Sequence, residues 1–225
     1  MSGQPRLVQV RVNVLKKNDL LARDLRKRFH DAGVRVISLV SSPGAGKTAF
    51  LEQILSRLRQ DFRVAALVGD LATENDAIRL ARSQVPVKQI VTGTVCHLEA
   101  EMVRSAIEGW NLDQLDFLFI ENVGNLVCPS SYDLGEELRL VLLSVTEGED
   151  KPLKYPTIFN TADVAVITKL DLAEAVQFNS ALSECNIQLV RPGMRVLKLS
   201  AKTGEGMAQC VDLFTSLSVR TTITS

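Results

Sequence analysis

The chain has 225 residues, enough for one α/β domain with a substantial buried core. Its 26 basic and 26 acidic residues balance, so no net charge draws the protein to nucleic acid or to an anionic membrane surface. It has no apolar run of 18 residues, and its first 17 residues lack the pattern of a secretory signal, so we expect a cytoplasmic protein without a membrane segment. The four cysteines show no C-x-x-C spacing and are expected to remain thiols in a reducing compartment.

The first residues form an extension ahead of the main domain. Residues 7–14 alternate between apolar and polar side chains, and either add an edge strand or lie on the surface; the pattern does not decide between these two. Asn18 is a suitable N-cap for an amphipathic helix, because apolar residues follow it at intervals of four as far as Gly33. We therefore expect an N-terminal extension over residues 1–33.

The main domain, over residues 34–219, alternates between apolar strands and helical patterns. The expected strands cover residues 34–40, 63–68, 88–91, 117–120, 138–145, 163–168 and 195–199. The expected helices cover residues 49–58, a segment from about 75, residues 98–110 and a closing segment around 207–214. Such alternation predicts right-handed crossovers and a mostly parallel sheet of about seven strands, with helices on both faces. Residues 220–225 remain an unassigned tail.

The stretch S-S-P-G-A-G-K-T at residues 41–48 lies between the first strand and a helix. Strand, Gly-rich turn and helix start together indicate a P-loop, in which backbone amides hold phosphates, Lys47 reaches the β and γ phosphates, and the Thr48 hydroxyl binds Mg²⁺. Ser41 stands where the motif usually begins with Gly, and a serine makes this turn if its φ is negative. The residues expected to contact nucleotide here are Ser42, Gly44, Ala45, Gly46, Lys47, Thr48 and Ala49.

Two carboxylates follow strands that lead toward the P-loop. Asp70 ends the second expected strand and Glu121 ends the fourth, and parallel sheets bind ligands beyond the carboxyl ends of their strands. We expect both to bind Mg²⁺ directly or through water, and Gly124 to offer its backbone N–H to the γ phosphate. The alternatives are a helix N-cap at Asp70 and a structural carboxylate at Glu121, but a carboxylate after an apolar strand requires a partner.

The sequences T-K-L-D at 168–171 and S-A-K at 200–202 follow the last two strands and look like the guanine-specificity pair of GTPases. The Asp171 carboxylate can accept hydrogen bonds from both the ring N–H and the amino group of guanine, a pattern that adenine lacks, while the lysine stems cover the ring faces. Thr168 replaces the usual Asn. The pair favours GTP over ATP. Its assigned residues are Lys169, Asp171, Ser200, Ala201 and Lys202.

Soft metal ligands follow two strands of the same sheet edge. Cys96 and His97 lie beyond the third expected strand and Cys128 beyond the fourth, so their loops can meet. Thiolates and imidazole suit Zn²⁺ and can suit Ni²⁺. From local spacing alone the alternative is two core-facing cysteines and a surface histidine. Cys185 and Cys210 lie on the apolar stripes of helical patterns and are assigned to packing.

Three further blocks carry a resemblance to a known family. They are T-G-T-V-C-H-L-E-A (92–100), E-N-V-G-N-L-V-C-P (121–129) and S-V-T-E-G-E-D-K-P-L-K-Y-P (144–156). These blocks closely resemble the HypB family of GTPases, which assist nickel insertion into nickel-iron hydrogenases. The similarity runs from about residue 34 to residue 207, and the blocks are far more specific than the P-loop.

The resemblance implies roles for particular residues. Cys96, His97 and Cys128 match the family residues that bind Zn²⁺ or Ni²⁺ at a nucleotide-linked dimer interface. The Mg²⁺ carboxylates of related GTPases match Asp70 and Glu121, with Asp76 as a further candidate. Many family members also carry a His-rich or Cys-rich N-terminal nickel store, but residues 1–33 hold only His30, so storage is not implied.

The hypothesis is therefore a GTP-hydrolysing nickel metallochaperone that works as a homodimer. The resemblance also implies a HypA-like nickel chaperone and a hydrogenase large-subunit precursor as partners. One alternative is a GTPase for another metalloenzyme such as urease, against which blocks 121–129 and 144–156 argue. A partitioning-type ATPase is disfavoured because it requires Lys at the place of Ser42. The alternative from another class is a non-catalytic metal-binding adaptor whose nucleotide only stabilises the fold.

Overall fold

The computed structural model describes residues 6–70 and 75–219, and at residues 6–11, 75, 218 and 219 it describes the backbone only. The strands are β1 (Arg35–Ser41), β2 (Val64–Asp70), β3 (Val87–Val91), β4 (Phe117–Glu121), β5 (Leu138–Ser144), β6 (Val164–Thr168) and β7 (Arg195–Lys198). The α-helices are α1 (Arg6–Asp31), α2 (Lys47–Leu58), α3 (Asn75–Ala81), α4 (Ala100–Ala106), α5 (Lys151–Lys154), α6 (Pro156–Thr161), α7 (Ser180–Val190) and α8 (Met207–Val219). Short 3-10 helices cover Leu112–Gln114, Cys128–Ser131, Val145–Glu147 and Leu170–Leu172.

The strands of the described residues form one seven-stranded sheet in the order β3-β2-β4-β1-β5-β6-β7, and each neighbouring pair is parallel. β1 lies at the centre because the chain first builds one side of the sheet, through β2 to β4, and then crosses to β5. Its carboxyl end is therefore the point at which strand order reverses, where open α/β sheets bind ligands. The predicted fold class is confirmed.

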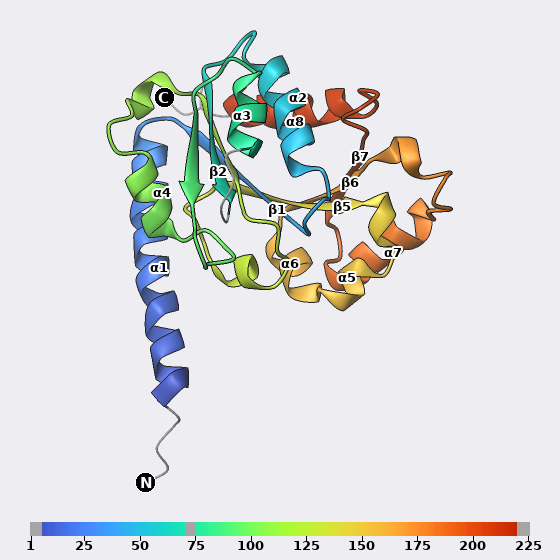
Figure 1. Ribbon diagram of the computed structural model, residues 1–225, viewed down its shortest axis with the longest axis horizontal. Helices are drawn as coiled ribbons and strands as arrows, with labels where there is room; N and C mark the ends of the chain where they lie inside the picture. Colours follow the sequence, from blue (N-terminus) through green and yellow to red (C-terminus); the bar gives the residue numbers. More distant parts are fainter. Residues whose placement is uncertain (1–5, 71–74, 220–225) are drawn as a thin grey trace.

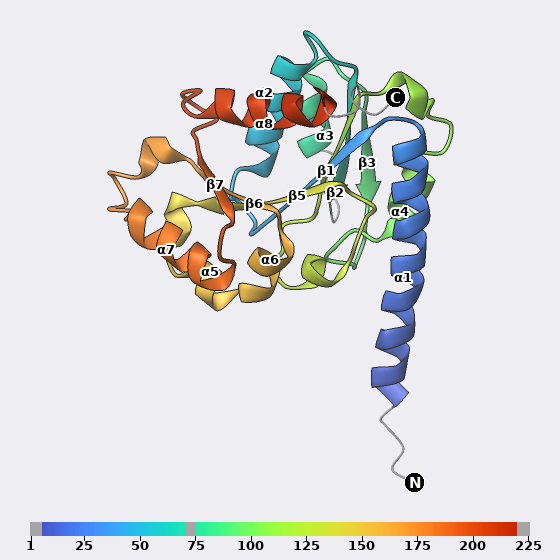
Figure 2. The same ribbon diagram turned by 180° about the vertical axis from the view of Figure 1, so that it is seen from behind.

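Helices cover both faces of the sheet (Figure 1). On one face, α2 and α8 pack through Phe50 and Phe214. On the other, α1 and α4 form a second cluster and α6 and α7 a third (Figure 2). Ile37 of β1 belongs to the first of these clusters, Val36 to the second and Val40 to the third. Both faces of β1 are thus buried, as its continuous apolar sequence predicts.

Helix α1 differs from the expectation at its start. It begins at Arg6, so residues 7–14 are helical rather than extended, and Asn18 lies inside the helix rather than at an N-cap. A helix satisfies the backbone hydrogen bonds of this segment without a neighbouring strand. Leu25 and Phe29 join the core, whereas the N-terminal half of α1 extends beyond the body (Figures 1 and 2). Neither α1 nor another helix of the described residues is long and apolar enough to cross a membrane.

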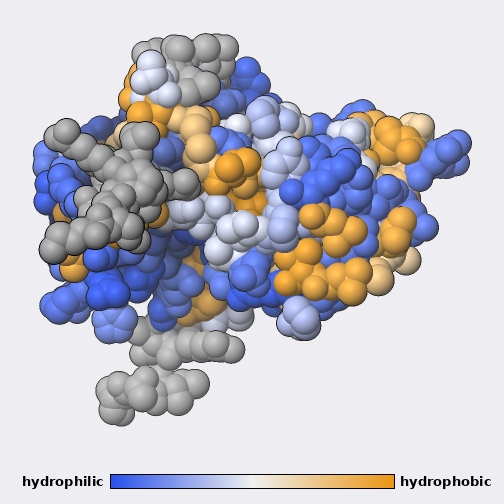
Figure 3. Space-filling view, turned by 90° about the horizontal axis from the view of Figure 1, so that it is seen from below, coloured by the Kyte–Doolittle hydropathy of each residue, from blue (hydrophilic) through white to orange (hydrophobic). Residues whose placement is uncertain are grey.

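Helix α7 leaves apolar side chains at the surface. Leu182 and Leu189 of α7 are exposed. Figure 3 shows apolar surface on the side of the molecule away from α1. Cys185 is exposed as well, so its assignment to packing is wrong: α7 buries the side that carries Ile187 instead. Cys210 of α8 is fully buried in the core, as predicted, and burial raises the pKa of its thiol to about 12.

Candidate functional site

The P-loop connects the buried end of β1 to α2. Gly44 has a φ of 72° and Gly46 a φ of 93°, conformations that glycine adopts without a steric penalty. Gly46 precedes the first residue of α2, and among the described residues no side chain caps the helix there. The first N–H groups of α2 remain available to an anion, and the helix dipole favours negative charge at this end. The turn therefore has the geometry of a phosphate site.

Lys47 is buried at the start of α2, and its Nζ donates a hydrogen bond to Ser41 Oγ at 2.8 Å. Burial lowers the pKa of Lys47, although the carboxylates of Glu121, Asp76 and Glu147 act in the opposite direction. Ser41 is not among the residues with positive φ, so it makes the turn as expected. The sequence did not reveal that Ser41 accepts a hydrogen bond from Lys47 or that the charge of Glu147 acts on this lysine. The only signals were the place of Ser41 in the P-loop motif and the place of Glu147 in block 144–156.

Glu121 and Thr48 lie together beside this lysine. Thr48 Oγ1 donates to Glu121 Oε1 at 2.8 Å. Glu121 is 2% exposed, and burial raises the pKa of its carboxyl to about 7 although the Lys47 charge acts to lower it. Its Oε2 is buried without a hydrogen-bond partner among the described residues. A buried oxygen of this kind next to a hydroxyl fits a cation, so these residues suit Mg²⁺.

Two further acidic residues follow from the neighbouring strand β2: Asp70 at its end and Asp76 at the start of α3. Asp70 ends β2 two residues beyond Val68, the residue that pairs with Glu121 across the β2–β4 ladder. The Asp70 carbonyl accepts a hydrogen bond from Thr92 N at 2.9 Å, which fixes the start of the next loop. Asp76 lies in the first turn of α3, and its charge acts to raise the pKa values of both Lys47 and Glu121. Both carboxylates are thus at the expected edge of the sheet.

A second recess holds most of the residues assigned to guanine recognition. A cavity of about 310 Å³ is lined by Gly46, Ala49, Lys169, Asp171, Ala201 and Lys202, together with apolar neighbours. Ser200 is fully buried behind it, and its Oγ donates to Asp171 Oδ1 at 2.6 Å. Lys202 Nζ lies 3.9 Å from Asp171 Oδ2. The structure therefore brings both motifs to one cavity, with the Asp171 side chain fixed by Ser200.

Thr168 and Lys169 join this cavity to the P-loop. Thr168 Oγ1 donates to the carbonyl of Ala45 at 2.7 Å, and Lys169 Nζ donates to the carbonyl of Gly44 at 2.7 Å. Lys169 has a φ of 60°, a left-handed conformation that is uncommon outside glycine. Thr168 thus holds the P-loop from the position where related motifs carry Asn.

The three predicted soft ligands converge. The ligand atoms of Cys96, His97 and Cys128 all lie within 4.8 Å of one another, and the two Sγ atoms are 3.0 Å apart. Both cysteines are half-buried thiols. Two thiols and an imidazole at such distances can bind one ion of Zn²⁺ or Ni²⁺. The alternative of two core-facing cysteines and a surface histidine does not match this arrangement.

His97 has the burial and bonding of a ligand rather than of a surface residue. It is 9% exposed, and its ring lies against that of Tyr132 with centroids 3.9 Å apart. Neither ring nitrogen has a hydrogen-bond partner among the described residues, although Nε2 lies 3.4 Å from Glu99 Oε1. Burial lowers the pKa of His97 and favours the neutral ring, while Glu99 acts to raise it. Neutral imidazole is the form that binds metals.

Two asparagines fix the metal-binding loops to each other. Asn122 Oδ1 accepts from Leu98 N at 3.0 Å, and Asn125 Nδ2 donates to the Cys96 carbonyl at 3.3 Å. The sequence did not single out these two, and the only signal was their place in block 121–129. Between them, Gly124 lies so close to Pro43 that a Cβ atom would be 2.9 Å from the Pro43 Cα. The segment after β4 therefore contacts both the P-loop and the cysteine loops.

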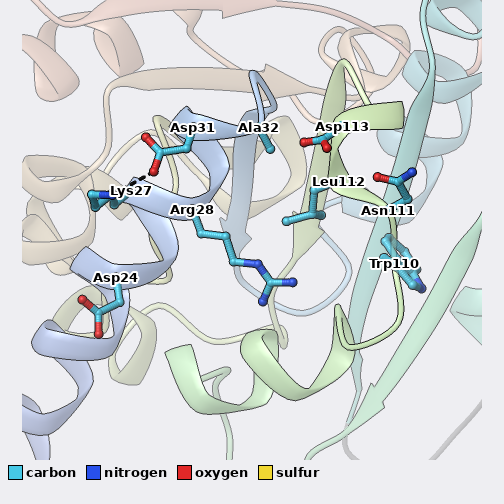
Figure 4. A pocket seen from close by; sticks show the side chains of 9 residues that line it. All are labelled: Asp24, Lys27, Arg28, Asp31, Ala32, Trp110, Asn111, Leu112 and Asp113. Atoms are coloured by element: carbon cyan, nitrogen blue, oxygen red, sulfur yellow. Dashed lines mark hydrogen bonds and ion pairs between the residues drawn. The ribbon is translucent and has the colours of Figure 1, made fainter.

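A larger recess, of about 510 Å³, lies away from these residues between α1 and the segment after α4 (Figure 4). Ala32 precedes β1 and Asp113 precedes β4, so the recess is at the amino ends of the strands. Figure 4 shows Lys27 paired with Asp31 on the same helix, where their atoms are 2.9 Å apart. None of the described site residues lines this recess, and it is not the nucleotide site.

Comparison with known proteins decides the family. A family model described as the CobW/HypB/UreG nucleotide-binding domain matches residues 35–198. The hydrogenase maturation factor HypB of Rhizobium leguminosarum bv. viciae is 45% identical over 205 residues, which cover 91% of this chain and 69% of that relative. The chain belongs to the HypB family.

The HypB likeness extends to the three-dimensional structure. The crystal structure of HypB from Helicobacter pylori in complex with nickel superposes with a TM-score of 0.86 at 40% identity, covering 93% of this chain and 98% of that one. A Helicobacter pylori relative, named a hydrogenase/urease maturation factor HypB, is 43% identical over 199 residues. The match covers 87% of this chain and 81% of the relative's length. The HypB resemblance of the three blocks is confirmed, as is the nucleotide-binding α/β fold.

Proposed function

We propose that this HypB-family protein is a GTP-hydrolysing metallochaperone that assists nickel insertion into nickel-iron hydrogenase. The observation that carries the proposal is the convergence of Cys96, His97 and Cys128 within 4.8 Å, on loops attached to the phosphate edge of a nucleotide-binding domain. The name of the Rhizobium relative supports hydrogenase maturation, and the nickel complex of the Helicobacter protein supports nickel as the cargo.

Hydrolysis in this proposal depends on positioning and charge. Lys47 and the P-loop amides hold the β and γ phosphates, and the Gly124 N–H approaches the γ phosphate as water attacks in line. The residues proposed to hold Mg²⁺ are Thr48, Asp70 and Glu121, with Asp76 as a further candidate. When bound, Mg²⁺ supplies positive charge to the phosphates. The buried Oε2 of Glu121 supports this assignment, because a cation would provide the partner that it lacks among the described residues.

Guanine selection is assigned to the cavity around Asp171. Its carboxylate can accept from the ring N–H and amino group of guanine, and the hydrogen bond from Ser200 holds it in position. The Lys169 and Lys202 side chains line the same cavity and can cover the ring faces. This arrangement supports GTP rather than ATP as the nucleotide.

The metal site is proposed to be shared by two copies of the chain. One chain brings three soft ligands together, whereas a closed Zn²⁺ site usually has four. A two-fold interface supplies the remainder, since each loop then meets its own copy. Because Gly124 contacts the P-loop and leads to Cys128, GTP and metal should each favour the dimer by reciprocal linkage.

The proposed cellular setting follows from the family. A cytoplasmic homodimer would receive nickel with a HypA-like chaperone and serve the hydrogenase large-subunit precursor. Residues 34–219 would form the GTPase domain and residues 1–33 an extension. Because the Helicobacter relative is named for both hydrogenase and urease, delivery to urease is the second candidate function.

Metal affinity provides the first test. Zn²⁺ and Ni²⁺ affinities are measured by competition with a coloured chelator for the wild type, Cys128→Ser and Cys185→Ser. Cys128→Ser should weaken binding by at least about a hundred-fold, since the loss of an outer contact alone typically costs roughly ten- to a hundred-fold. Cys185→Ser is the matched control, because that thiol is exposed on α7 and should leave affinity unchanged. Equal affinities for all three proteins would refute the site.

Hydrolysis and assembly provide the second test. Multiple-turnover GTP hydrolysis should be lost in Lys47→Ala, and sedimentation of the metal-loaded wild type should show a dimer with a GTP analogue and more monomer with GDP. Hydrolysis that survives Lys47→Ala would favour an adaptor with a purely structural nucleotide. A monomer that binds metal equally in every nucleotide state would refute the shared site but not the GTPase.

A further inference from the structure

Asn18 is the one polar residue of the described α1 side chains that is buried. It is 5% exposed and bonds to the first residue of α4 and to the loop that follows Cys128. Its Oδ1 accepts from Ala100 N at 2.9 Å, and its Nδ2 donates to the Asp133 carbonyl at 2.8 Å. Ala100 lies shortly after His97 in the chain, and Asp133 lies shortly after Cys128. A single amide therefore holds the backbone beyond both groups of soft ligands.

The two hydrogen bonds account for an asparagine at this place. Asparagine is a poor helix former, and burial of its amide costs free energy unless both ends are hydrogen-bonded. Here the amide oxygen accepts from Ala100 N and the amide nitrogen donates to the Asp133 carbonyl, so both ends are bonded. An apolar residue would continue the packed stripe of Leu25 and Phe29 but would leave Ala100 N without its acceptor. Asparagine at this position is therefore explained by its hydrogen bonds to other segments and not by the stability of α1.

Asn18 also marks where α1 leaves the body. On its N-terminal side, Val12 and Val14 are 43% and 42% exposed, whereas the core-facing stripe begins on its C-terminal side at Ala22. Arg26, two turns further along α1, bonds the Asp133 carboxylate at 2.7 and 2.8 Å. The loop that follows Cys128 is therefore attached to α1 through Asp133. The segment that precedes Cys128 is attached through Asn125 to the Cys96 carbonyl.

We propose that Asn18 is a positioning residue for the metal site: by holding the backbone at Ala100 and at Asp133, it sets the separation of the Cys96–His97 loop from the Cys128 loop and makes metal affinity depend on α1. This inference rests on the proposed metal site. Outer contacts that orient ligands typically change metal affinity by roughly ten- to a hundred-fold when lost. The effect should act on affinity even though Asn18 touches none of the three ligands.

The test uses Zn²⁺ alone, the nucleotide-free full chain and competition with a coloured chelator. Asn18→Ala should raise the Zn²⁺ dissociation constant by about ten-fold. Asn18→Asp keeps the acceptor for Ala100 N and removes the donor to the Asp133 carbonyl, so it should show a similar loss in a side chain of nearly unchanged shape. Leu25→Ala is the matched control: it weakens the packing of α1 and leaves both hydrogen bonds in place, so affinity should stay within about two-fold.

Hydrogen exchange of the metal-free proteins gives an independent readout. The Ala100 amide should exchange faster in Asn18→Ala and remain protected in Asn18→Asp and Leu25→Ala. Wild-type affinity in both folded Asn18 variants, or an equal loss in Leu25→Ala, would overturn the proposal. Cys96→Ala is measured in parallel: if it binds Zn²⁺ as the wild type does, the metal site itself is wrong, whichever way the Asn18 variants behave.

Discussion

At and beside the P-loop, three polar side chains already bond to acceptors of the same chain, whereas at the cysteine loops the imidazole of His97 does not. Lys47 bonds Ser41, Thr48 bonds Glu121, and Lys169 bonds the carbonyl of Gly44. Both nitrogens of His97 are buried without a hydrogen-bond partner in the described parts of the chain. The two regions share one edge of the sheet but differ in how complete they are.

The difference indicates how each region is organised. The nucleotide side, which comprises the P-loop and Glu121, is built on the ends of central strands, so its groups are held in position by the fold itself. The metal side consists of the loop with Cys96 and His97 and the loop with Cys128. Asparagine side chains hold these two loops, and one of the asparagines comes from α1. Substitutions in the nucleotide side should therefore change the rate of GTP hydrolysis. Substitutions of residues that hold the cysteine loops should change the affinity for metal.

The largest effect expected on one region alone comes from Glu121→Gln. Removing this charge should reduce GTP hydrolysis by about a hundred-fold, the typical loss when one preorganised electrostatic group is deleted. The melting temperature should not fall, because a buried carboxylate is expensive to hold and glutamine can still accept from Thr48. Zn²⁺ affinity without nucleotide should stay unchanged. An early melt together with lost activity would instead identify Glu121 as structural.

The nucleotide side was the more predictable of the two regions. A P-loop is a local pattern, since the glycines, the lysine and the strand before them are adjacent in sequence. The strand-end carboxylates followed from parallel topology, because the carboxyl ends of such strands meet at one edge. Glu121 lies at this edge, and its carboxylate accepts a hydrogen bond from Thr48.

The parts that sequence did not reveal depend on contacts between distant segments. Asn18 looked like an N-cap, because its bonds to Ala100 and Asp133 are invisible without the fold. Residues 7–14 alternate like a strand, yet the described sheet offers them no neighbour and the helix continues through them. Cys185 lies on an apolar stripe that α7 turns outward. Local pattern is insufficient in each case because tertiary packing selects the face that is buried.

A smaller effect, confined to nucleotide choice, is expected from Asp171→Asn. The amide places a donor where guanine requires an acceptor, so GTP affinity should fall by roughly ten-fold or more, equivalent to about 1.5 to 3 kcal/mol for a charged hydrogen bond. Xanthine nucleotide should bind better than GTP. The measurement is nucleotide binding by titration calorimetry, with Zn²⁺ affinity as the control that should not change. Unchanged GTP affinity would contradict the guanine assignment.

The smallest expected effect tests the attachment of the metal side to α1. Burial acts to raise the pKa of Asp133, but the Arg26 guanidinium and the Gly135 N–H outweigh it, so the pKa lies below its usual range. A carboxyl with a lowered folded-state pKa stabilises the fold above its unfolded pKa of about 3.9, and this stabilisation is lost as pH falls through the folded pKa. Asp133→Asn should therefore lower the free energy of unfolding at pH 7 by about 1 kcal/mol or less, since Arg26 is half exposed and solvent screens the pair.

The pH dependence distinguishes this charge effect from a general loss of packing. Asparagine retains an oxygen for the Gly135 N–H and removes the negative charge that pairs with Arg26. The difference in unfolding free energy between wild type and Asp133→Asn should be constant near neutral pH and shrink below about pH 4. Asp24→Asn, an exposed change on the same helix, is the control and should show no difference at either pH. A loss in Asp133→Asn that persists in acid would mean that the contact acts through shape, and that the loop after Cys128 is attached to α1 by Asn18 rather than by charge.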